Sequence, residues 1–188
     1  MREKSLKDIK ILGGIGALLP LFGFLPKIGW ILSFVSFIIL IFAIKKLADI
    51  SEQRKIFTNY LISFLLNIGA GTMIFLGLVG FLGTGILGWW RGKIGFAFLR
   101  GVLFFLGCAI VGWILEIVGA LFLKKSFQEI GKRFKTDIFS LTGVIFFIGA
   151  LLSPLLIGIL LIIPIGSIFT AVSFLSLPDK FTLKENQP

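Results

Sequence analysis

The stretch IFTNYLISFLLNIGAGTMIFLGLVGFLGTGILGWW, residues 56–90, contains no charged side chain and decides the class of fold. If its 35 residues formed one α-helix, that helix would be about 52 Å long at about 1.5 Å per residue. The hydrocarbon core of a bilayer is only about 30 Å thick. We therefore expect a membrane-spanning helix over about residues 60–80, followed by a glycine-rich interfacial or re-entrant piece over residues 81–98.

The rest of the chain has the same apolar character. Of its 188 residues, 57% are hydrophobic and 15% are charged, whereas soluble domains average about 45–50% and about 25%. One small core could not bury so much apolar surface, so the composition indicates a membrane protein. It also excludes disorder, because 14% of the residues are aromatic, and a disulfide scaffold, because there is one cysteine.

Charged residues and prolines divide the chain into six apolar segments, each about as long as a membrane-spanning helix. We expect an all-α, polytopic transmembrane bundle that forms a single integral membrane domain over residues 1–188. The expected spans cover about residues 9–25, 28–44, 60–80, 101–123, 138–156 and 159–177. Glycines and Pro20 interrupt the first segment, and five spans remain if that segment is re-entrant. Pro154 and Gly158 predict a tight hairpin near residues 155–158.

Lysine and arginine residues are distributed unevenly between the two sides of these six spans. One side, which includes both chain ends and the basic loops 45–55 and 124–137, holds 15 of them, and the other side holds 4. Cytoplasmic loops carry the excess of positive charge. We therefore expect a protein of the cytoplasmic membrane, with its N- and C-termini in the cytoplasm.

The tryptophans agree with this orientation. Trp30, Trp89 and Trp90 fall near span ends on the expected outer side, and tryptophan prefers the membrane–water interface. The net charge of +10 therefore reflects orientation first and attraction to anionic lipid second.

A short sequence repeat runs through the odd-numbered spans. Ile-Gly-Ala occurs at residues 15–17, 68–70 and 148–150, and the outer copies extend to GALLP and GALLSP. This pattern fits three tandem helix hairpins, a parallel repeat of the kind that some transporters contain. The alternative is chance, because the chain contains 23 glycines.

Several short motifs resemble a known family. They are LGGIGALL at residues 12–19, Pro26 with the Phe/Ile span that follows, IFTN at residues 56–59, Thr142-Gly143, GALL at residues 149–152, Ile157-Gly158 and AVSF at residues 171–174. Together they resemble a prokaryotic membrane-protein family catalogued as domain of unknown function 996, over nearly the whole chain apart from about residues 83–100. The resemblance implies an integral membrane protein of archaea or bacteria, and it brings no activity and no catalytic residues.

Glu116 is the only acidic residue well inside an apolar segment. A carboxylate there is costly unless it is protonated, paired or hydrated, so such residues are functional candidates. With a period of 3.6 residues, Glu116 shares a face with Cys108, Gly112 and Gly119, a small-residue stripe of the kind that packs against another helix.

Two interpretations of Glu116 are open. It could form a proton- or cation-responsive site, or its carboxyl could be hydrogen-bonded within the bundle or reach toward Lys124 or Lys125. The second candidate is Asn67, for which we expect a hydrogen bond to another helix.

The chemistry of soluble enzymes is not expected. With no histidine and one cysteine, neither a zinc site nor a histidine-activated nucleophile can be assembled. GTGILG at residues 83–88 matches the dinucleotide-binding pattern but lacks the acidic residue about 20 positions on, so we expect no cofactor.

We therefore expect a non-enzymatic membrane protein that acts structurally or binds partners. The expected partners are the lipid bilayer, further copies of the chain and other membrane proteins, and not nucleic acid. The alternative is a small transporter or channel whose pathway is lined by Glu116 and Asn67.

Overall fold

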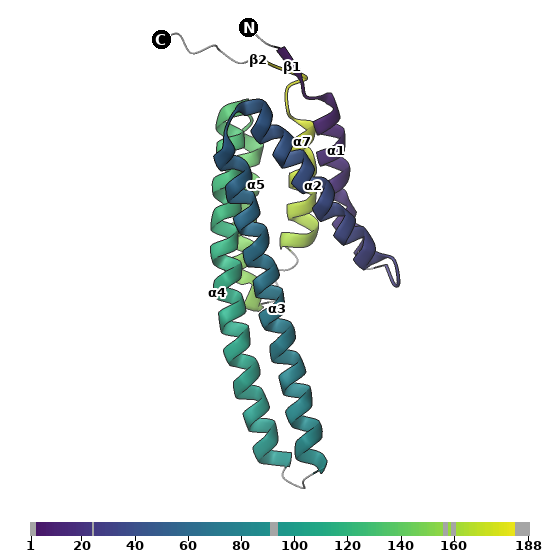
Figure 1. The fold of residues 1–188 in the computed structure, drawn as a ribbon, viewed down its shortest axis with the longest axis vertical. Helices are drawn as coiled ribbons and strands as arrows, with labels where there is room; N and C mark the ends of the chain where they lie inside the picture. Colours follow the sequence, from purple (N-terminus) through teal and green to yellow (C-terminus); the bar gives the residue numbers. More distant parts are fainter. Residues whose placement is uncertain (1–2, 24, 91–93, 156–157, 159–160, 183–188) are drawn as a thin grey trace. The chain divides into compact units, whose positions relative to one another are not determined.

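The computed structural model describes residues 3–23, 25–90, 94–155, 158 and 161–182, and most of them are helical (Figure 1). The all-α class expected from the sequence is therefore confirmed. The described elements are, in chain order, β1 (Glu3–Ser5), α1 (Lys7–Leu18), the 3-10 helix η1 (Leu19–Phe22), α2 (Gly29–Ser51), α3 (Arg54–Trp90), α4 (Ile94–Phe134), α5 (Asp137–Leu152), the 3-10 helix η2 (Ser153–Leu155), the π-helix η3 (Leu161–Gly166), α7 (Ser167–Leu175) and β2 (Lys180–Thr182).

The chain divides into two compact units. Unit 1 consists of Met1–Ile62 and Ala120–Pro188, and unit 2 consists of Ser63–Gly119. Helices α3 and α4 each contribute one part to unit 1 and one part to unit 2.

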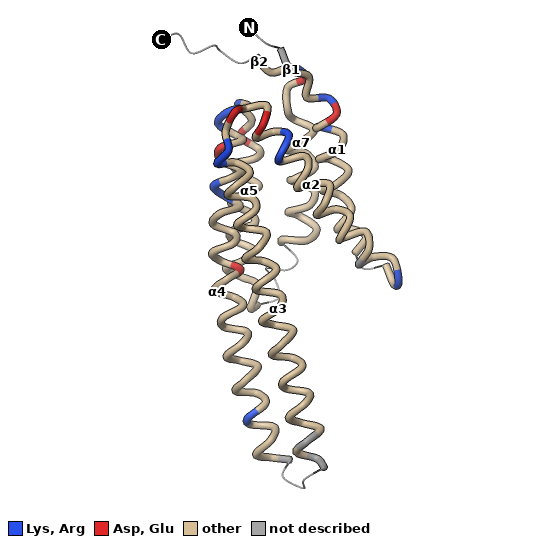
Figure 2. Tube along the Cα trace, in the orientation of Figure 1, with Lys and Arg blue, Asp and Glu red and all other residues tan. Residues whose placement is uncertain are grey.

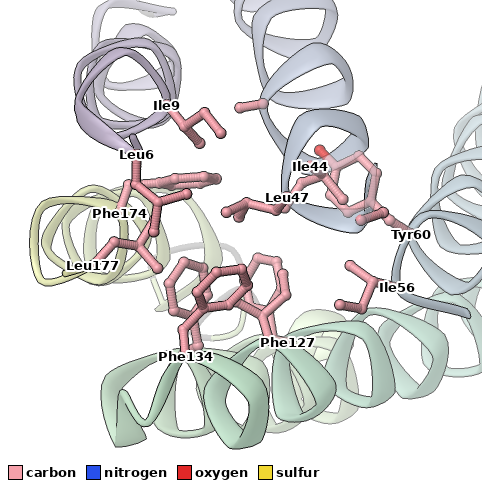
Figure 3. Close-up of a cluster of buried hydrophobic side chains, with 14 residues drawn as sticks. Leu6, Ile9, Ile44, Leu47, Ile56, Tyr60, Phe127, Phe134, Phe174 and Leu177 are labelled. Carbon is pink, nitrogen blue, oxygen red and sulfur yellow. The ribbon is translucent and has the colours of Figure 1, made fainter. Parts of the chain in front are cut away.

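Unit 1 has a core of large apolar side chains that converge from its helices (Figure 3). Aromatic rings form a chain through this core, with centroids 5.6 Å apart between Phe127 and Phe139 and 5.4 Å apart between Phe139 and Phe174. Both pairs meet edge to face, an arrangement worth about 0.5–1.5 kcal/mol each beyond the buried area. Edge-to-face contacts between these rings therefore connect α4, α5 and α7.

Glycines of α1 make room for α7. Gly13 and Gly14 are buried in α1, and a side chain at Gly13 would overlap the ring of Phe174. The helix continues through these glycines and tightens into η1 only at Leu19, next to Pro20. The glycines that made this segment look irregular are therefore the contact surface for α7.

The two chain ends of unit 1 are joined. Strands β1 and β2 pair antiparallel, with Lys4 opposite Phe181. The Lys10 ammonium donates a hydrogen bond of 2.7 Å to Asp179, and this bond with the nearby charge lowers the pKa of the Asp179 carboxyl. The two described chain ends, which we expect on the same side of a membrane, therefore lie together in unit 1.

The charged residues of unit 1 gather at helix ends. Figure 2 shows them where α1 begins, where α2 gives way to α3, and where α4 gives way to α5. The core of unit 1 draws residues from these same helix ends, including Leu47, Ile56 and Phe134. The largest buried side chains of unit 1 therefore lie beside its basic segments.

The two predicted basic loops are shorter than expected. Helix α2 runs to Ser51 and α3 begins at Arg54, so most of residues 45–55 are helical. Residues 124–134 belong to α4, because Phe127, Ile130 and Phe134 recur at helical spacing and are buried. The prediction of a loop over 124–137 was wrong for all but its last residues.

Unit 2 consists of the later part of α3 and the earlier part of α4, which pack against each other along their lengths. Glycines lie at their contacts, since a side chain at Gly80 would overlap Phe104 and one at Gly101 would overlap Thr84. Most large apolar side chains of unit 2 point away from this contact and are exposed.

The expected break in α3 near residue 81 does not occur. Helix α3 continues from Arg54 to Trp90, and residues 94–98 begin α4. The prediction of a helix that ends near residue 80 was therefore wrong, and the interfacial placement expected for residues 81–98 stays a prediction. Gly77 and Gly80 of α3 pack against Cys108 and Phe104 of α4, and this close packing offsets their cost of about 1 kcal/mol each, whereas a side chain at Gly83 or Gly85 would meet nothing within 4 Å.

Four described helices are long and apolar enough to cross a membrane. They are Ile31–Ser51, Arg54–Ile86, Gly95–Phe134 and Asp137–Leu155. The apolar helix Ile162–Leu175 is shorter, and α1 has 12 residues, about 18 Å at 1.5 Å per residue. The second to fifth predicted spans therefore each correspond to a long helix, whereas the helices found in the first and sixth predicted spans are short. The predicted hairpin near 155–158 falls largely outside the described residues.

The three Ile-Gly-Ala copies share one pattern of exposure. Their isoleucines, at positions 15, 68 and 148, are exposed, and their alanines, at positions 17, 70 and 150, are buried. Helices α1 and α5 also both end in a 3-10 turn that contains a proline. These similarities support the repeat of helix hairpins.

Candidate functional site

The small-residue stripe of α4 faces α3, as the helical period predicts. A side chain at Gly112 would lie 3.1 Å from the carbonyl oxygen of Ala70. The Cβ of Cys108 lies 2.8 Å from the position that a Cβ of Gly77 would take. The backbones of the two helices therefore approach closely on this face.

Glu116 lies on this face between two of these contacts. It is half-buried, about one helical turn from Gly112 and from Gly119. Measured along α4 it is about 22 Å from Gly101 and about 12 Å from Lys124. Figure 2 shows an acidic position isolated part-way along α4.

Asn67 lies against the same contact from α3. A side chain at Gly119 would lie 2.8 Å from Asn67 Nδ2, so the amide fills the space beside that glycine. Asn67 Nδ2 donates hydrogen bonds to Ser63, at 2.8 Å to its carbonyl oxygen and 3.4 Å to its hydroxyl. The amide nitrogen thus bonds within α3, and the predicted hydrogen bond to another helix stays a prediction.

The structure therefore places Asn67 of α3 against Gly119 of α4, about one helical turn from Glu116, within unit 2. A carboxyl and a carboxamide in an apolar hairpin could bind a proton or a cation, or could fix the packing of the two helices. Among the described residues, no group of three His, Cys, Asp or Glu side chains could hold a metal ion. The two interpretations of Glu116 stay open on this geometry.

The buried hydroxyls of unit 1 were not predicted from the sequence. The Ser36 hydroxyl donates to the carbonyl oxygen of Gly16 in α1 over 2.6 Å, and the Ser126 hydroxyl donates to Ile56 in α3 over 2.8 Å. Such bonds hold apolar helices together. Single serines in otherwise apolar helices were the sequence feature that could have predicted these hydrogen bonds.

A third pair joins α5 to α7. The hydroxyls of Thr142 and Ser173 lie 2.8 Å apart, and each also lies within 2.8 Å of a carbonyl oxygen of its own helix. The two hydroxyl groups have two protons for three short oxygen–oxygen contacts, so one proton is shared between two acceptor oxygens. This saturated pair positions two helices and leaves no donor for a ligand.

Comparisons with known proteins agree with the resemblance seen in the sequence. The family model described as "Protein of unknown function (DUF996)" matches residues 30–181. An uncharacterised protein of Methanocaldococcus jannaschii is 31% identical over 181 residues, which are 95% of this chain and 97% of the relative. No solved structure matches the chain. Neither description names an activity, a ligand or a partner.

Proposed function

The chain belongs to the DUF996 family of proteins of unknown function, and we propose that it is a multi-pass protein of a prokaryotic cytoplasmic membrane. We propose further that it acts there without catalysis, as a structural component that binds lipid and other membrane proteins.

The observation that carries this proposal is the outward-facing apolar surface of unit 2. Leu65, Phe75, Leu103 and Ile110 are each more than half exposed on α3 and α4. In water, a contiguous surface of this kind drives association. Lipid tails are as apolar as these side chains, so a bilayer covers them without cost.

The distribution of charge supports the proposed orientation. The basic segments assigned to the cytoplasmic side meet at helix ends of unit 1, and the β1–β2 pair joins both chain ends there. Lys27 lies before the opposite end of α2. A cytoplasmic location of both termini accounts for this separation.

Labelling of single cysteines tests this orientation. Each variant carries Cys108→Ser and one of Lys27→Cys, Lys93→Cys, Lys46→Cys or Lys132→Cys. In intact cells an impermeant maleimide should label positions 27 and 93, and it should label positions 46 and 132 only after permeabilisation. Labelling of all four positions in intact cells, or of the opposite pair, would contradict the proposed orientation.

A small transporter or channel is the second candidate function. The observation that favours it is that Asn67 of α3 lies against Gly119, about one helical turn from Glu116, between two apolar helices. If Glu116 binds the transported ion, vesicles containing the purified protein should show a proton or cation flux that Glu116→Gln abolishes. The control Thr72→Ala removes an exposed hydroxyl of α3 that bonds only its own helix, and it should leave the flux intact. Vesicles without any flux above protein-free vesicles would rule out this candidate.

A further inference from the structure

Basic side chains of unit 1 lie at one level on its helices α2, α3 and α4. Contacts between the helices define this level. The Ser126 hydroxyl of α4 donates to the carbonyl oxygen of Ile56 in α3, and Ile56 packs in one buried cluster with Ile44 and Leu47 of α2 (Figure 3). The basic pairs next to these residues are therefore level to within about one helical turn. We call the three pairs the basic belt, which consists of Lys45, Lys46, Arg54, Lys55, Lys124 and Lys125.

In the proposed membrane location, the basic belt lies where the hydrocarbon core ends. Residues 101–123 of α4 include one charged side chain, Glu116. These 23 residues form about 34 Å of helix at about 1.5 Å per residue, enough to cross a core of about 30 Å. On α2, residues 29–44 carry no charge before Lys45. Lys124 and Lys45 are therefore the first basic residues beyond the core.

The acidic side chains of helices α2, α4 and α5 in unit 1 begin only on the far side of the basic belt. Asp49 and Glu52 follow the basic pair of α2. Glu129 follows the pair of α4, and Asp137 begins α5. From Lys124 to Glu129 the helix rises about 8 Å, and the headgroup layer on one side of a bilayer is about 5–8 Å thick. The basic belt is therefore about as deep as that layer and contains cations alone.

The basic belt has no opposite charge within the described part of the chain. None of its side chains forms an ion pair with an Asp or Glu there, whereas Lys10 near the chain ends pairs with Asp179. Lys124 is half-buried, and the other side chains of the belt are exposed. Like charges repel one another unless an anion lies among them. The arrangement therefore favours an anionic partner from outside the chain.

Two ammonium groups of the basic belt lie against aromatic rings. Lys124 Nζ lies 5.0 Å from the ring centroid of Phe147 in α5, and Lys125 Nζ lies 5.3 Å from that of Phe122. Both rings are on the hydrocarbon side, because Phe122 precedes the belt on α4 and Phe147 lies one turn beyond Gly143, which packs against Lys124. These cation–π contacts hold the two ammonium groups at the boundary of the hydrocarbon core, and not extended into the cytoplasm.

We infer that the basic belt lies in the headgroup layer of the cytoplasmic leaflet and binds the phosphate groups of anionic lipids. The inference rests on the membrane location and orientation proposed above. Lysine ammonium groups pair with phosphate as point charges, and the Arg54 guanidinium can pair with it in a forked geometry. Anionic lipids of the cytoplasmic leaflet attract basic residues next to membrane-spanning helices.

Depth and charge favour lipid over a protein partner. A second copy of the chain in the same membrane would bring its own basic belt to the same depth, where like charges repel. Its first acidic residue beyond the belt on α4, Glu129, would lie about 8 Å farther out. A soluble acidic protein would have to displace lipid headgroups before it reached Lys124 or Lys125. Anionic lipid is already present at this depth.

Electron spin resonance of spin-labelled lipids tests the inference on the full chain in vesicles. Lipids in contact with a membrane protein give a motionally restricted signal, and comparing labelled phosphatidylglycerol with labelled phosphatidylcholine measures selectivity. The belt pair variant is Lys45→Gln, Lys46→Gln. The control pair, Lys132→Gln, Lys135→Gln, removes the same charge from exposed positions beyond the belt. A third variant changes every lysine of the belt, at positions 45, 46, 55, 124 and 125, to glutamine.

The unaltered protein should select phosphatidylglycerol at least about twofold over phosphatidylcholine. The belt pair should lower this preference, the five-lysine variant should bring it close to one, and the control pair should leave it unchanged. The restricted phosphatidylcholine signal should be equal in all proteins, which shows that each variant is still inserted. If the five-lysine variant loses that signal, the comparison of the two pairs decides.

Two results would overturn the inference. One is equal selection of the two lipids by the unaltered protein, and the other is an equal loss of selectivity in the belt pair and the control pair. If neither lipid gave a restricted signal with the unaltered protein, the proposed membrane location itself would be contradicted.

Discussion

The two units of this protein pack by different means. Unit 1 buries large side chains, such as Phe139 and Phe174, beside its charged helix ends. Unit 2 brings two backbones together at glycines and turns its large side chains outward. The hydrophobic effect operates only where water is the alternative, whereas association in lipid relies on close packing. With the proposed membrane location, this contrast is the one expected if the core of unit 1 forms at the aqueous boundary and unit 2 is surrounded by lipid.

The largest expected effect is a difference in stability loss between two Phe→Ala substitutions, one in each unit. Phe174 is fully buried and Phe75 is 63% exposed. Phe174→Ala should lower the free energy of unfolding by about 3–5 kcal/mol through the cavity it leaves. Phe75→Ala should change it by less than about 0.5 kcal/mol. Unfolding titrations with sodium dodecyl sulfate in mixed micelles measure both, and equal losses would erase the contrast between the units.

Glycines sharpen the comparison within unit 2. A Cβ at Gly112 would press on the backbone of Ala70, whereas one at Gly107 would meet nothing within 4 Å. Gly112→Leu should therefore cost about 1–3 kcal/mol by overpacking. Gly107→Leu should be neutral or stabilising by up to about 1 kcal/mol through its higher helix propensity. The same unfolding titrations measure both changes. A larger loss of unfolding free energy at position 107 than at position 112 would mean that α4 packs through another face.

The hydroxyl pair of unit 1 should show measurable coupling. In a double-mutant cycle, Thr142→Val and Ser173→Ala should have a coupling energy of about 0.6 kcal/mol, with an upper limit of about 1.7 kcal/mol. The control pair joins Thr142→Val with Thr72→Ala of unit 2, whose hydroxyl bonds only its own helix. That pair should be additive. Zero coupling between Thr142 and Ser173 would contradict the shared proton.

The smallest effect concerns the joined chain ends. Because the ion pair with Lys10 lowers the pKa of Asp179 below its usual 3.8, the pair stabilises the folded ends above pH 3.8. This contribution is lost as the pH falls through the lowered value. The protection of amides in β1 and β2 against hydrogen exchange, relative to the intrinsic rate at each pH, should therefore fall in acid, and Asp179→Asn should remove that dependence. Protection that is the same at pH 3 and pH 6 in the unaltered chain would contradict this account.

Composition and periodicity predicted much of the architecture. The apolar runs predicted the long helices α2 to α5, because such runs in a membrane must satisfy their backbone hydrogen bonds internally. The period of 3.6 residues also predicted which face of α4 packs, through Cys108, Gly112 and Gly119. Both inferences depend on local pattern alone.

The failures arose where a distant partner decides the outcome. The predicted end of a helix near Gly80 was wrong, because Gly80 packs against Phe104 of the facing helix, which no local pattern identifies. Phe127 and Phe134 did carry a helical period, which the neighbouring lysines obscured.

The central claim, that the outer surface of unit 2 faces lipid, is tested most directly by a spin label at position 75. In vesicles containing the Cys108→Ser, Phe75→Cys protein, collisions with oxygen should far exceed those with a water-soluble nickel chelate. A label at Lys132→Cys, in the basic segment, should show the reverse. If the nickel chelate reached position 75 as readily as position 132, or if neither reagent reached it, the surface would face water or protein and the account would be contradicted.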